Sequence, residues 1–366
     1  MQVTKVAILG AGNGGITAAA DLTQKGFKVN IFESDKFCKN LDVIKEKNEI
    51  TVEYKGSTSV EKINLITNDI KEAIDSCEII MIVVPGMGIE YFAEILAPVV
   101  KEEQIILINS APAMAAVRFI KKVKEMGISK NLKVGETNSL TYATRAYVDE
   151  ARVEISLKAG KVYLAAYPTC NTNEVVDVCA QIYDCFVKAE NVIRINLENP
   201  NPLIHPGPTL LNAGRIEYSK GDFWLYKEGI TEHTVNIVKA VEDEREKIAN
   251  ALGLQLEDIN QARINRGYFV DEDKPLHELF NTSPVFKNIK GPASVEGRYM
   301  VEDISMGLVL WSDLGKALNV STPNIDSIII LGGTLLQRDF YKEGLTLESI
   351  GLGNLKGKDE ILENIW

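Results

Sequence analysis

A glycine-rich turn behind a short apolar strand constrains this fold most. Lys5–Leu9 is rich in β-forming residues, and Gly10, Gly12 and Gly15 follow at once, where an alanine-rich helical segment begins. In such a Gly-x-Gly-x-x-Gly motif the first glycine allows the tight turn, the second lets the backbone approach a pyrophosphate, and the third allows close helix–strand packing. We therefore predict that Gly10, Gly12, Asn13 and Gly15 bind a dinucleotide at the helix N-terminus. A glycine-rich turn without a ligand is the alternative.

Glu33 ends the second predicted strand, residues 28–33. A carboxylate at this position accepts hydrogen bonds from the adenosine ribose hydroxyls and repels a 2′-phosphate. The sequence therefore favours NAD as the cofactor, with NADH preferred over NADPH. Lys36 keeps NADP open, because a nearby cation can hold the extra phosphate. The alternative is that Glu33 is only a solvated strand end.

Strands and helices continue to alternate up to about residue 190, which predicts a doubly wound Rossmann sheet of the α/β class. The almost continuously apolar run 78–85 suits a strand buried on both faces of a parallel sheet. Loops at the carboxyl ends of such strands line the ligand crevice, so Pro85 and residues 109–111 are expected to be walls of the cofactor site. Further predicted elements are two strands able to form a hairpin, residues 151–158 and 161–168, and a helix over residues 173–186.

Beyond residue 190 the pattern becomes helical. Residues 192–199 still resemble a strand, and the proline-rich segment 199–212 is interpreted as a stiff loop. Residues 231–253 then carry apolar side chains at helical spacing and end in glycine. A chain of 366 residues is expected to form two domains. We predict a Rossmann domain over residues 1–190 and an all-helical substrate domain over residues 191–366, with the active site in the cleft between them.

Charge and composition exclude several classes of function. The formal net charge of −11 and the lack of a basic block argue against nucleic acid or an anionic membrane as a partner. No apolar run approaches the ~20 residues that span a bilayer, and no secretory signal is apparent. Five cysteines without a Cys-x-x-Cys pair and only three histidines argue against a zinc site. We expect a reduced, cytoplasmic protein that holds no metal.

His205 stands between Ile204 and Pro206 in the proline-rich segment. The surrounding prolines fix φ and so lower the entropy lost when a side chain is held in place. Imidazole is the usual group for proton transfer near neutral pH, so we predict that His205 is a general acid–base. A histidine in a stiff hinge without a chemical role is the alternative. His233 and His277 are weaker candidates.

A catalytic histidine needs an orienting partner for its second ring nitrogen. Asp303 is predicted to be this partner, and the N-cap of a helix that begins near residue 304 is its alternative or additional role. Arg298 is predicted to clamp a substrate carboxylate with its bidentate guanidinium; otherwise it is a surface arginine. Arg145 is a second candidate for binding a carboxylate.

Five segments, in this order along the chain, resemble the octopine/nopaline-type opine dehydrogenases: GAGNGG, ETNSLTYATR, NPLIHPGPTLLNAGRIE, GRYMVEDISMGLV and STPNIDSIIILG. The resemblance implies a Rossmann domain followed by a helical domain like that of 6-phosphogluconate dehydrogenase. It implies NAD(P)H-dependent condensation of an L-amino acid with a 2-oxo acid such as pyruvate, by a monomer or a homodimer. It makes His205 the acid–base, Asp303 its partner and Arg298 a pocket residue. Thr141 departs from the family, whose members often have proline there, and this puts fine substrate positioning in doubt.

Two other functions stay open from the residues alone. A glycerol-3-phosphate or ketopantoate-type dehydrogenase would have the same architecture but would rely on a lysine of the helical half, where Lys220 and Lys239 are candidates. A non-catalytic NAD(H)-sensing module would need the glycine-rich turn alone. The presence of His205, Arg298 and Asp303 together favours an enzyme.

Overall fold

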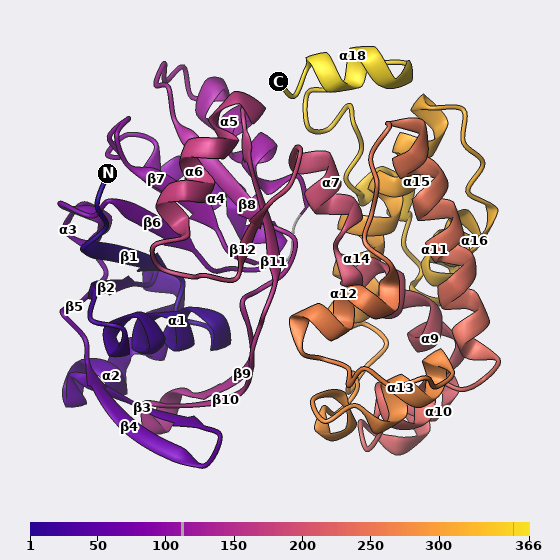
Figure 1. The fold of residues 1–366 in the computed structure, drawn as a ribbon, viewed down its shortest axis with the longest axis horizontal. Helices are drawn as coiled ribbons and strands as arrows, with labels where there is room; N and C mark the ends of the chain where they lie inside the picture. The colour runs from indigo at the N-terminus through magenta and orange to yellow at the C-terminus, as the bar shows by residue number, and fades with distance from the viewer. Residues whose placement is uncertain (111–112, 354) are drawn as a thin grey trace. The chain divides into compact units, whose positions relative to one another are not determined.

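The computed structural model describes residues 1–110, 113–353 and 355–366. These residues form two compact units, Met1–Ile195 and Asn196–Trp366 (Figure 1). The first unit combines sheets with helices, and in its described residues the second unit consists of helices and turns. An α/β unit of the predicted Rossmann class is therefore followed by a helical unit.

The central sheet of the first unit has eight strands in the order β12-β11-β8-β7-β6-β1-β2-β5. Its strands pair in parallel, except that β11 runs antiparallel to β8. Strand β1 lies in the interior of the sheet, so the glycine-rich turn that follows it opens at the carboxyl edge. The strands are β1 (Lys5–Leu9), β2 (Lys28–Phe32), β5 (Leu65–Thr67), β6 (Ile79–Ile82), β7 (Ile105–Ile108), β8 (Lys133–Thr137), β11 (Val162–Tyr167) and β12 (Phe186–Lys188).

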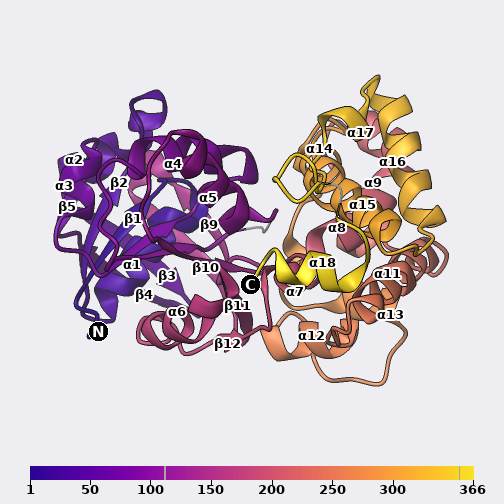
Figure 2. The ribbon, with the colours of Figure 1, turned by 90° about the horizontal axis from the view of Figure 1, so that it is seen from above.

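Helices cover both faces of this sheet. In Figure 2, α4 and α5 lie on one side of the sheet and α6 on the other. Helix α5 occupies a stretch for which the sequence predicted no element. Helix α6 ends earlier than the predicted helix over residues 173–186, which also contains a turn and the start of β12. The helices are α1 (Asn13–Gln24), α2 (Asp42–Lys47), α3 (Ile70–Ile74), α4 (Ile89–Leu96), α5 (Ala115–Glu125) and α6 (Thr172–Cys179).

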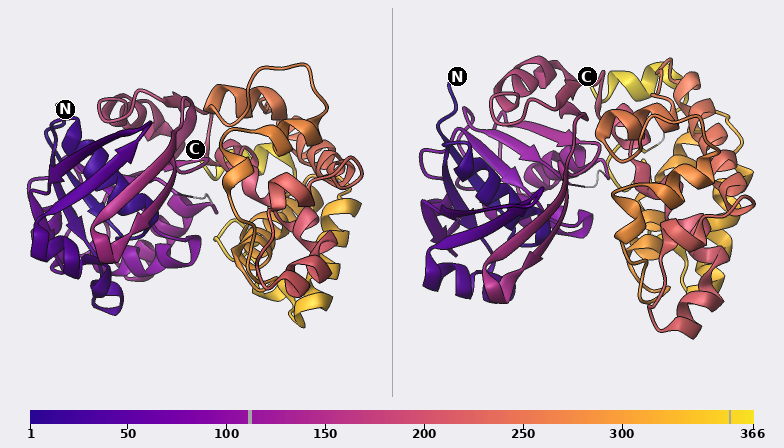
Figure 3. Two further views of the ribbon diagram at one scale, coloured as in Figure 1. Left: turned by 90° about the horizontal axis from the view of Figure 1, so that it is seen from below. Right: turned by 60° about the horizontal axis from the view of Figure 1, so that its bottom comes forward.

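A second sheet of four strands has the order β4-β3-β10-β9 and faces the viewer in the left view of Figure 3. The predicted hairpin over residues 151–168 is wrong, because β10 pairs with β9 and β3 whereas β11 pairs with β8 and β12. Their burial explains the separation: β10 buries alternate side chains, but β11 is buried over most of its length and suits a central sheet. The strands are β3 (Glu49–Tyr54), β4 (Ser57–Lys62), β9 (Tyr142–Tyr147) and β10 (Arg152–Lys158).

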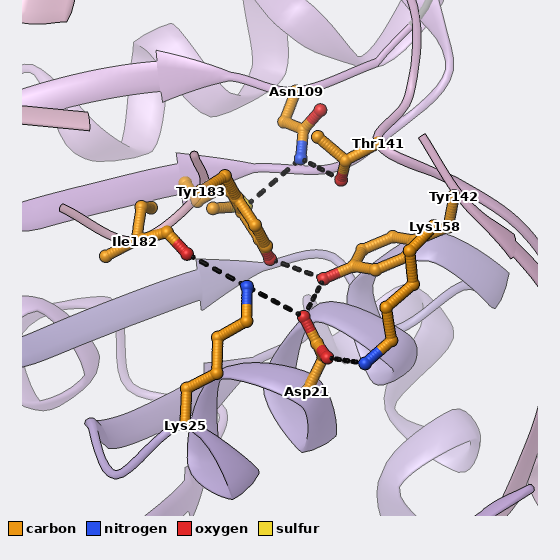
Figure 4. Close-up of polar contacts among 9 residues, drawn as sticks. Asp21, Lys25, Asn109, Thr141, Tyr142, Lys158, Ile182 and Tyr183 are labelled. Atoms are coloured by element: carbon orange, nitrogen blue, oxygen red, sulfur yellow. Dashed lines mark hydrogen bonds and ion pairs between the residues drawn. The ribbon is translucent and has the colours of Figure 1, made fainter. Parts of the chain in front are cut away.

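A buried carboxylate fastens helix α1 to this second sheet. Asp21 is 1% exposed; it accepts a hydrogen bond from the Tyr142 hydroxyl at 2.8 Å, and it pairs with Lys25 at 3.4 Å and with Lys158. The Tyr142 hydroxyl lies 2.6 Å from that of Tyr183, which follows α6. Figure 4 shows these side chains converging on Asp21. The network ties α1, β9, β10 and the segment that follows α6 together.

Residues 192–197 form helix α7 (Val192–Leu197), so the predicted strand over residues 192–199 is wrong. The side chain of Asn191 accepts a hydrogen bond from the Arg194 N–H at 3.0 Å and so caps the start of the helix. Short apolar runs do not distinguish a strand from a buried helix, and the cap decides between them here.

The second unit packs its helices around α9, which contacts α11, α14 and α16. No helix in the described part of the chain is long and apolar enough to cross a membrane. The same residues contain no cluster of three or more potential metal ligands. The helices are α8 (Pro200–Ile204), α9 (Pro206–Leu211), α10 (Ala213–Ser219), α11 (Thr234–Ala251), α12 (Ile259–Arg266), α13 (Leu276–Thr282), α14 (Arg298–Asp303), α15 (Val309–Ala317), α16 (Pro323–Leu336), α17 (Phe340–Glu343) and α18 (Gly357–Glu363).

Candidate active site

The three motif glycines meet different surroundings. Gly10 has φ +106°, and a Cβ there would lie 2.6 Å from the Val83 carbonyl oxygen. A Cβ on Gly15 would lie 1.8 Å from the Gly10 carbonyl oxygen, so residue 15 must have no side chain if α1 is to pack on β1. A Cβ on Gly12 would meet no protein atom within 4 Å. The backbone at Gly12 therefore borders open space, as a pyrophosphate cradle requires.

Helix α1 begins directly behind this cradle. Its N-cap, Gly12, is extended and provides no side-chain cap, so the first N–H groups are left for an external acceptor. The side-chain oxygen of Asn13 accepts a hydrogen bond from the Ala146 N–H of β9 at 2.9 Å. The oxygen of Asn13 thus holds the helix start against the second sheet. The residues fit a bound dinucleotide phosphate.

Glu33 is buried, and its carboxylate contacts the glycine-rich turn. Oε2 accepts a hydrogen bond from the Ala11 N–H at 2.7 Å, and Oε1 accepts one from the Ser34 N–H at 2.8 Å. Glu33 is therefore not the solvated strand end that the sequence left open. An ionised carboxylate offers about four lone-pair positions, so Oε2 keeps one for a ribose hydroxyl. Lys36, the cation that could receive a 2′-phosphate, is exposed.

The carboxyl ends of β6 and β7 flank the turn. Val83 and Val84, just before Pro85, are the residues that a Cβ on Gly10 would meet, so this loop lies against the turn. At the end of β7 the Asn109 side chain donates a hydrogen bond to the Thr141 hydroxyl at 3.0 Å (Figure 4). The residue that departs from the family pattern thus fixes a loop at this edge. Ala111, the last residue of the predicted second wall, lies outside the described residues.

His205 occupies the junction of two short helices, so the predicted loop over residues 199–212 is wrong. Helix α8 ends at Ile204 and α9 starts at Pro206, so His205 is the one residue between them, and Pro200 and Pro206 stand at the first positions of these helices. Proline is favoured there because the first N–H has no partner within the helix. These prolines thus mark the starts of two helices, and they still fix the backbone on both sides of the histidine.

The structure brings His205 and Asp303 together. Nδ1 of His205 lies 2.7 Å from Oδ2 of Asp303, and both side chains are buried. Asp303 is the last residue of α14 and makes no N-cap hydrogen bond, so its predicted capping role is wrong. Nε2 of His205 lies 2.8 Å from the hydroxyl of Tyr226, and the ring of Tyr299 stacks on the imidazole.

Burial sets the protonation of the neighbours of His205. It raises the pKa of the Asp303 carboxyl above its ordinary value, while the facing His205 opposes the shift. Burial also raises the pKa of Tyr226 well above its usual value, and the adjacent Tyr299 adds to this effect. Tyr226 therefore keeps its proton near neutral pH, and the direction of its hydrogen bond with Nε2 depends on the protonation of the imidazole.

Two π-helical turns shape this cluster. One, η5 (Leu225–Gly229), carries Tyr226, and the other, η7 (Ile304–Leu308), directly follows Asp303. A π turn inserts one extra residue into a helix and recurs at functional sites. The second turn joins α14 to α15 without a break, so Asp303 lies within a continuous helical rod.

Of the two predicted carboxylate binders, Arg298 lies near the His205 cluster, where its charge lowers the pKa of the Asp303 carboxyl, and Arg145 belongs to the first unit. The Arg298 side chain is 61% exposed, and its Nε donates to Glu302 Oε2 at 2.8 Å. Arg145 is exposed on β9, opposite Glu154 of β10. The alternative catalytic lysines, Lys220 and Lys239, are exposed as well, as is His233.

Sequence reasoning missed the two tyrosines. Tyr299 precedes Asp303 by four residues on one helix, a spacing that places both side chains on one face, so a signal was available. Tyr226 carries no comparable signal, because its approach to His205 depends on how the intervening chain folds.

Both halves of the chain match families of dehydrogenases. Residues 188–336 match the family described as NAD/NADP octopine/nopaline dehydrogenase, alpha-helical domain. Residues 5–134 match the family described as NAD-dependent glycerol-3-phosphate dehydrogenase N-terminus. An opine dehydrogenase of Arthrobacter sp. (strain 1C) is 33% identical over 352 residues, which cover 95% of each chain.

Solved structures show the same fold. Octopine dehydrogenase with NADH and L-arginine is similar with a TM-score of 0.73 and 18% identity, over 96% of this chain and 98% of that one. Yersinopine dehydrogenase with NADP⁺ is similar with a TM-score of 0.70 and 16% identity, over 100% and 99%. The predicted order, a Rossmann unit and then a helical unit, is confirmed.

Proposed function

The chain belongs to the octopine/nopaline dehydrogenase family, and from this membership we propose how its residues carry out the reaction of an opine dehydrogenase. It is an NAD(P)-dependent oxidoreductase of the CH–NH group, which condenses an amino acid with a 2-oxo acid and reduces the imine. The likeness to glycerol-3-phosphate dehydrogenases stops at residue 134, and the helical half matches the octopine/nopaline family. An opine, a secondary amine with two carboxylates, is therefore the product class.

Gly10, Gly12, Asn13 and Gly15 would hold the pyrophosphate, with Pro85 as a wall. The open space at Gly12 and the uncapped start of α1 support this assignment. Bound NADH supplies the two electrons and one hydrogen that reduce the imine carbon. Glu33 would accept the ribose hydroxyl and disfavour NADPH. A kcat/KM for NADPH equal to that for NADH would contradict the role of Glu33.

His205 would move the protons of the condensation, and the observation that carries this role is its buried contact with Asp303. The histidine would take a proton from the substrate ammonium, so that the free amine attacks the carbonyl. It would return that proton to the hydroxyl of the carbinolamine, which leaves as water while the C=N bond forms. Asp303 would hold the imidazole in one tautomer and stabilise the imidazolium.

Arg298, and in a second place Arg145, would bind substrate carboxylates. A guanidinium suits a carboxylate because of its paired N–H donors. Nε of Arg298 donates to Glu302, and the arginine side chain is 61% exposed, which supports such a contact. Solved octopine dehydrogenases contain L-arginine, agmatine or pyruvate. We propose pyruvate or a similarly small 2-oxo acid as one substrate here.

The test follows NADH oxidation by the full chain with pyruvate alone and with pyruvate plus a mixture of L-amino acids. Oxidation is expected only when both substrates are present. His205→Asn should lower kcat by about 100-fold or more, whereas His233→Asn, at an exposed histidine of the same unit, should not change it. Oxidation with pyruvate alone would contradict the proposed function.

A further inference from the structure

Both ring nitrogens of His205 already have partners. Nδ1 lies against Asp303 at 2.7 Å and Nε2 against the Tyr226 hydroxyl at 2.8 Å. Each ring nitrogen has one in-plane position for a hydrogen bond. The ring of Tyr299 covers one face of the imidazole. A substrate atom can therefore exchange a proton with His205 directly only after one of these partners has moved.

Tyr226 is held too firmly for an easy displacement. Its ring stacks on Phe286 with centroids 4.3 Å apart and also on Phe280. The Asn281 side chain donates hydrogen bonds to the carbonyl oxygens of Tyr226 and Ile230, at 2.7 and 2.9 Å, across the π turn η5. Backbone and ring are thus fixed separately, and the hydroxyl keeps its place at Nε2.

The contact works in both protonation states of the histidine. In neutral His205 with Nδ1–H donating to Asp303, the Tyr226 hydroxyl donates to Nε2. After protonation, Nε2–H donates to the Tyr226 oxygen, which frees the phenolic hydrogen for another acceptor. Only the hydroxyl hydrogen turns, and no heavy atom moves. In the neutral state the oxygen has two lone pairs, one within reach of the hydrogen-bonded Tyr299 hydroxyl and one for a substrate N–H.

We propose that Tyr226 is the catalytic residue that exchanges protons with the substrate, and that His205 and Asp303 store the proton behind it. This relay rests on the proposed function. The substrate ammonium gives a proton to the Tyr226 oxygen as the phenolic proton passes to Nε2. In the dehydration step the carbinolamine hydroxyl takes the phenolic proton, the C–O bond breaks, the nitrogen lone pair forms the C=N bond, and Nε2–H reprotonates the phenol. Paired transfers avoid a buried phenolate.

Tyr226→Phe in the full chain tests the relay, because it keeps the ring stack and removes one hydroxyl. Its kcat should fall about 100-fold, with the KM for NADH unchanged. Tyr268→Phe is the matched control, since Tyr268 stacks on the same Phe286. The double variant Tyr226→Phe/His205→Asn should be no slower than His205→Asn, because both residues act in one path. Wild-type kcat in Tyr226→Phe, with loss in His205→Asn, would overturn the relay.

A measurement on the wild-type protein does not depend on how the variants fold. Two protons that move together give a curved dependence of kcat on the deuterium fraction of the solvent, and a straight line would overturn the relay. Failure of the proposed function has a different signature. It would appear as NADH oxidation that needs no amino acid, or as a His205→Asn variant with full activity.

Discussion

The rings of Tyr299 and His205 lie face to face, with centroids 3.7 Å apart and planes 6° from parallel. Tyr299 and Asp303 belong to the same helix, α14. One helical turn thus provides both the stacking partner that fixes the tilt of the imidazole and the carboxylate that fixes its rotation. The position of the acid–base depends on how firmly α14 is placed.

Replacing Tyr299 should therefore slow the reaction without removing it. An aromatic stack is worth about 0.5–1.5 kcal/mol, so Tyr299→Leu should lower kcat by roughly 2- to 13-fold. Tyr299→Phe keeps the stack and should stay within about twofold of wild type. Steady-state kinetics at saturating substrates measures both. Equal losses in the two variants would point to the hydroxyl instead of the ring.

Asp303→Asn should separate stability from activity. Because burial raises the pKa of Asp303, the folded chain binds this proton more tightly than the unfolded chain does. Stability is therefore lost as the pH rises from the unfolded value, about 3.9, through the raised folded value. The asparagine side chain does not ionise, so the Asp303→Asn variant has no such loss. Its free energy of unfolding minus that of the wild-type protein should therefore rise from low to neutral pH. Its kcat should fall about 100-fold.

Urea unfolding of both proteins across this pH range measures the effect. A variant whose free energy of unfolding falls relative to wild type as the pH rises would show that the ion pair outweighs the cost of burying Asp303.

Gly12→Ala and Gly15→Ala should fail in different ways. A Cβ on Gly12 meets no protein atom, so the melting temperature should hold while NADH binds at least tenfold more weakly. A Cβ on Gly15 collides with the Gly10 carbonyl, so this variant should lose stability first. Thermal melts and NADH fluorescence titration distinguish the two. Unchanged NADH affinity in Gly12→Ala would remove this turn from the cofactor site.

Asp21→Asn should destabilise the first unit. The change leaves the buried end of the Lys158 contact without its charge and weakens the bond from Tyr142, at a cost of about 1–3 kcal/mol. Asp177→Asn, at an exposed position of α6, should change stability by less than about 0.5 kcal/mol. Denaturant unfolding compares them, and equal stabilities would show that the network in Figure 4 is dispensable.

Local patterns predicted the first unit well where structure is local. The run Lys5–Leu9 and the glycines that follow it predicted both the strand and the turn, because these features depend on residues that are close together in the sequence. The partners of β10 and β11 were not predictable in the same way, since pairing joins strands that are distant in sequence. Residues 192–197 were misassigned because a short segment with four apolar residues out of six fits a strand or a buried helix equally well.

The residues of the candidate site also differ in how far they could be predicted from the sequence. His205 and Asp303 could be paired from the sequence because the chemistry of a histidine calls for a carboxylate. Tyr226 could not be found, because the π turn that presents it has no simple sequence signature. The prolines were interpreted as stiffening a loop, but they begin helices. The sequence could not distinguish the two, because proline restricts φ in both settings.

The turn Ile304–Leu308 sets the phase of α14 against α15. A π turn takes up one extra residue, so the same residues wound as an ordinary α-helix would rotate everything before the turn by about one residue step, 100°. Asp303 would then face away from His205 while α15 kept its packing. At this place the winding of a single turn decides whether the carboxylate of a well-formed helix points at the histidine.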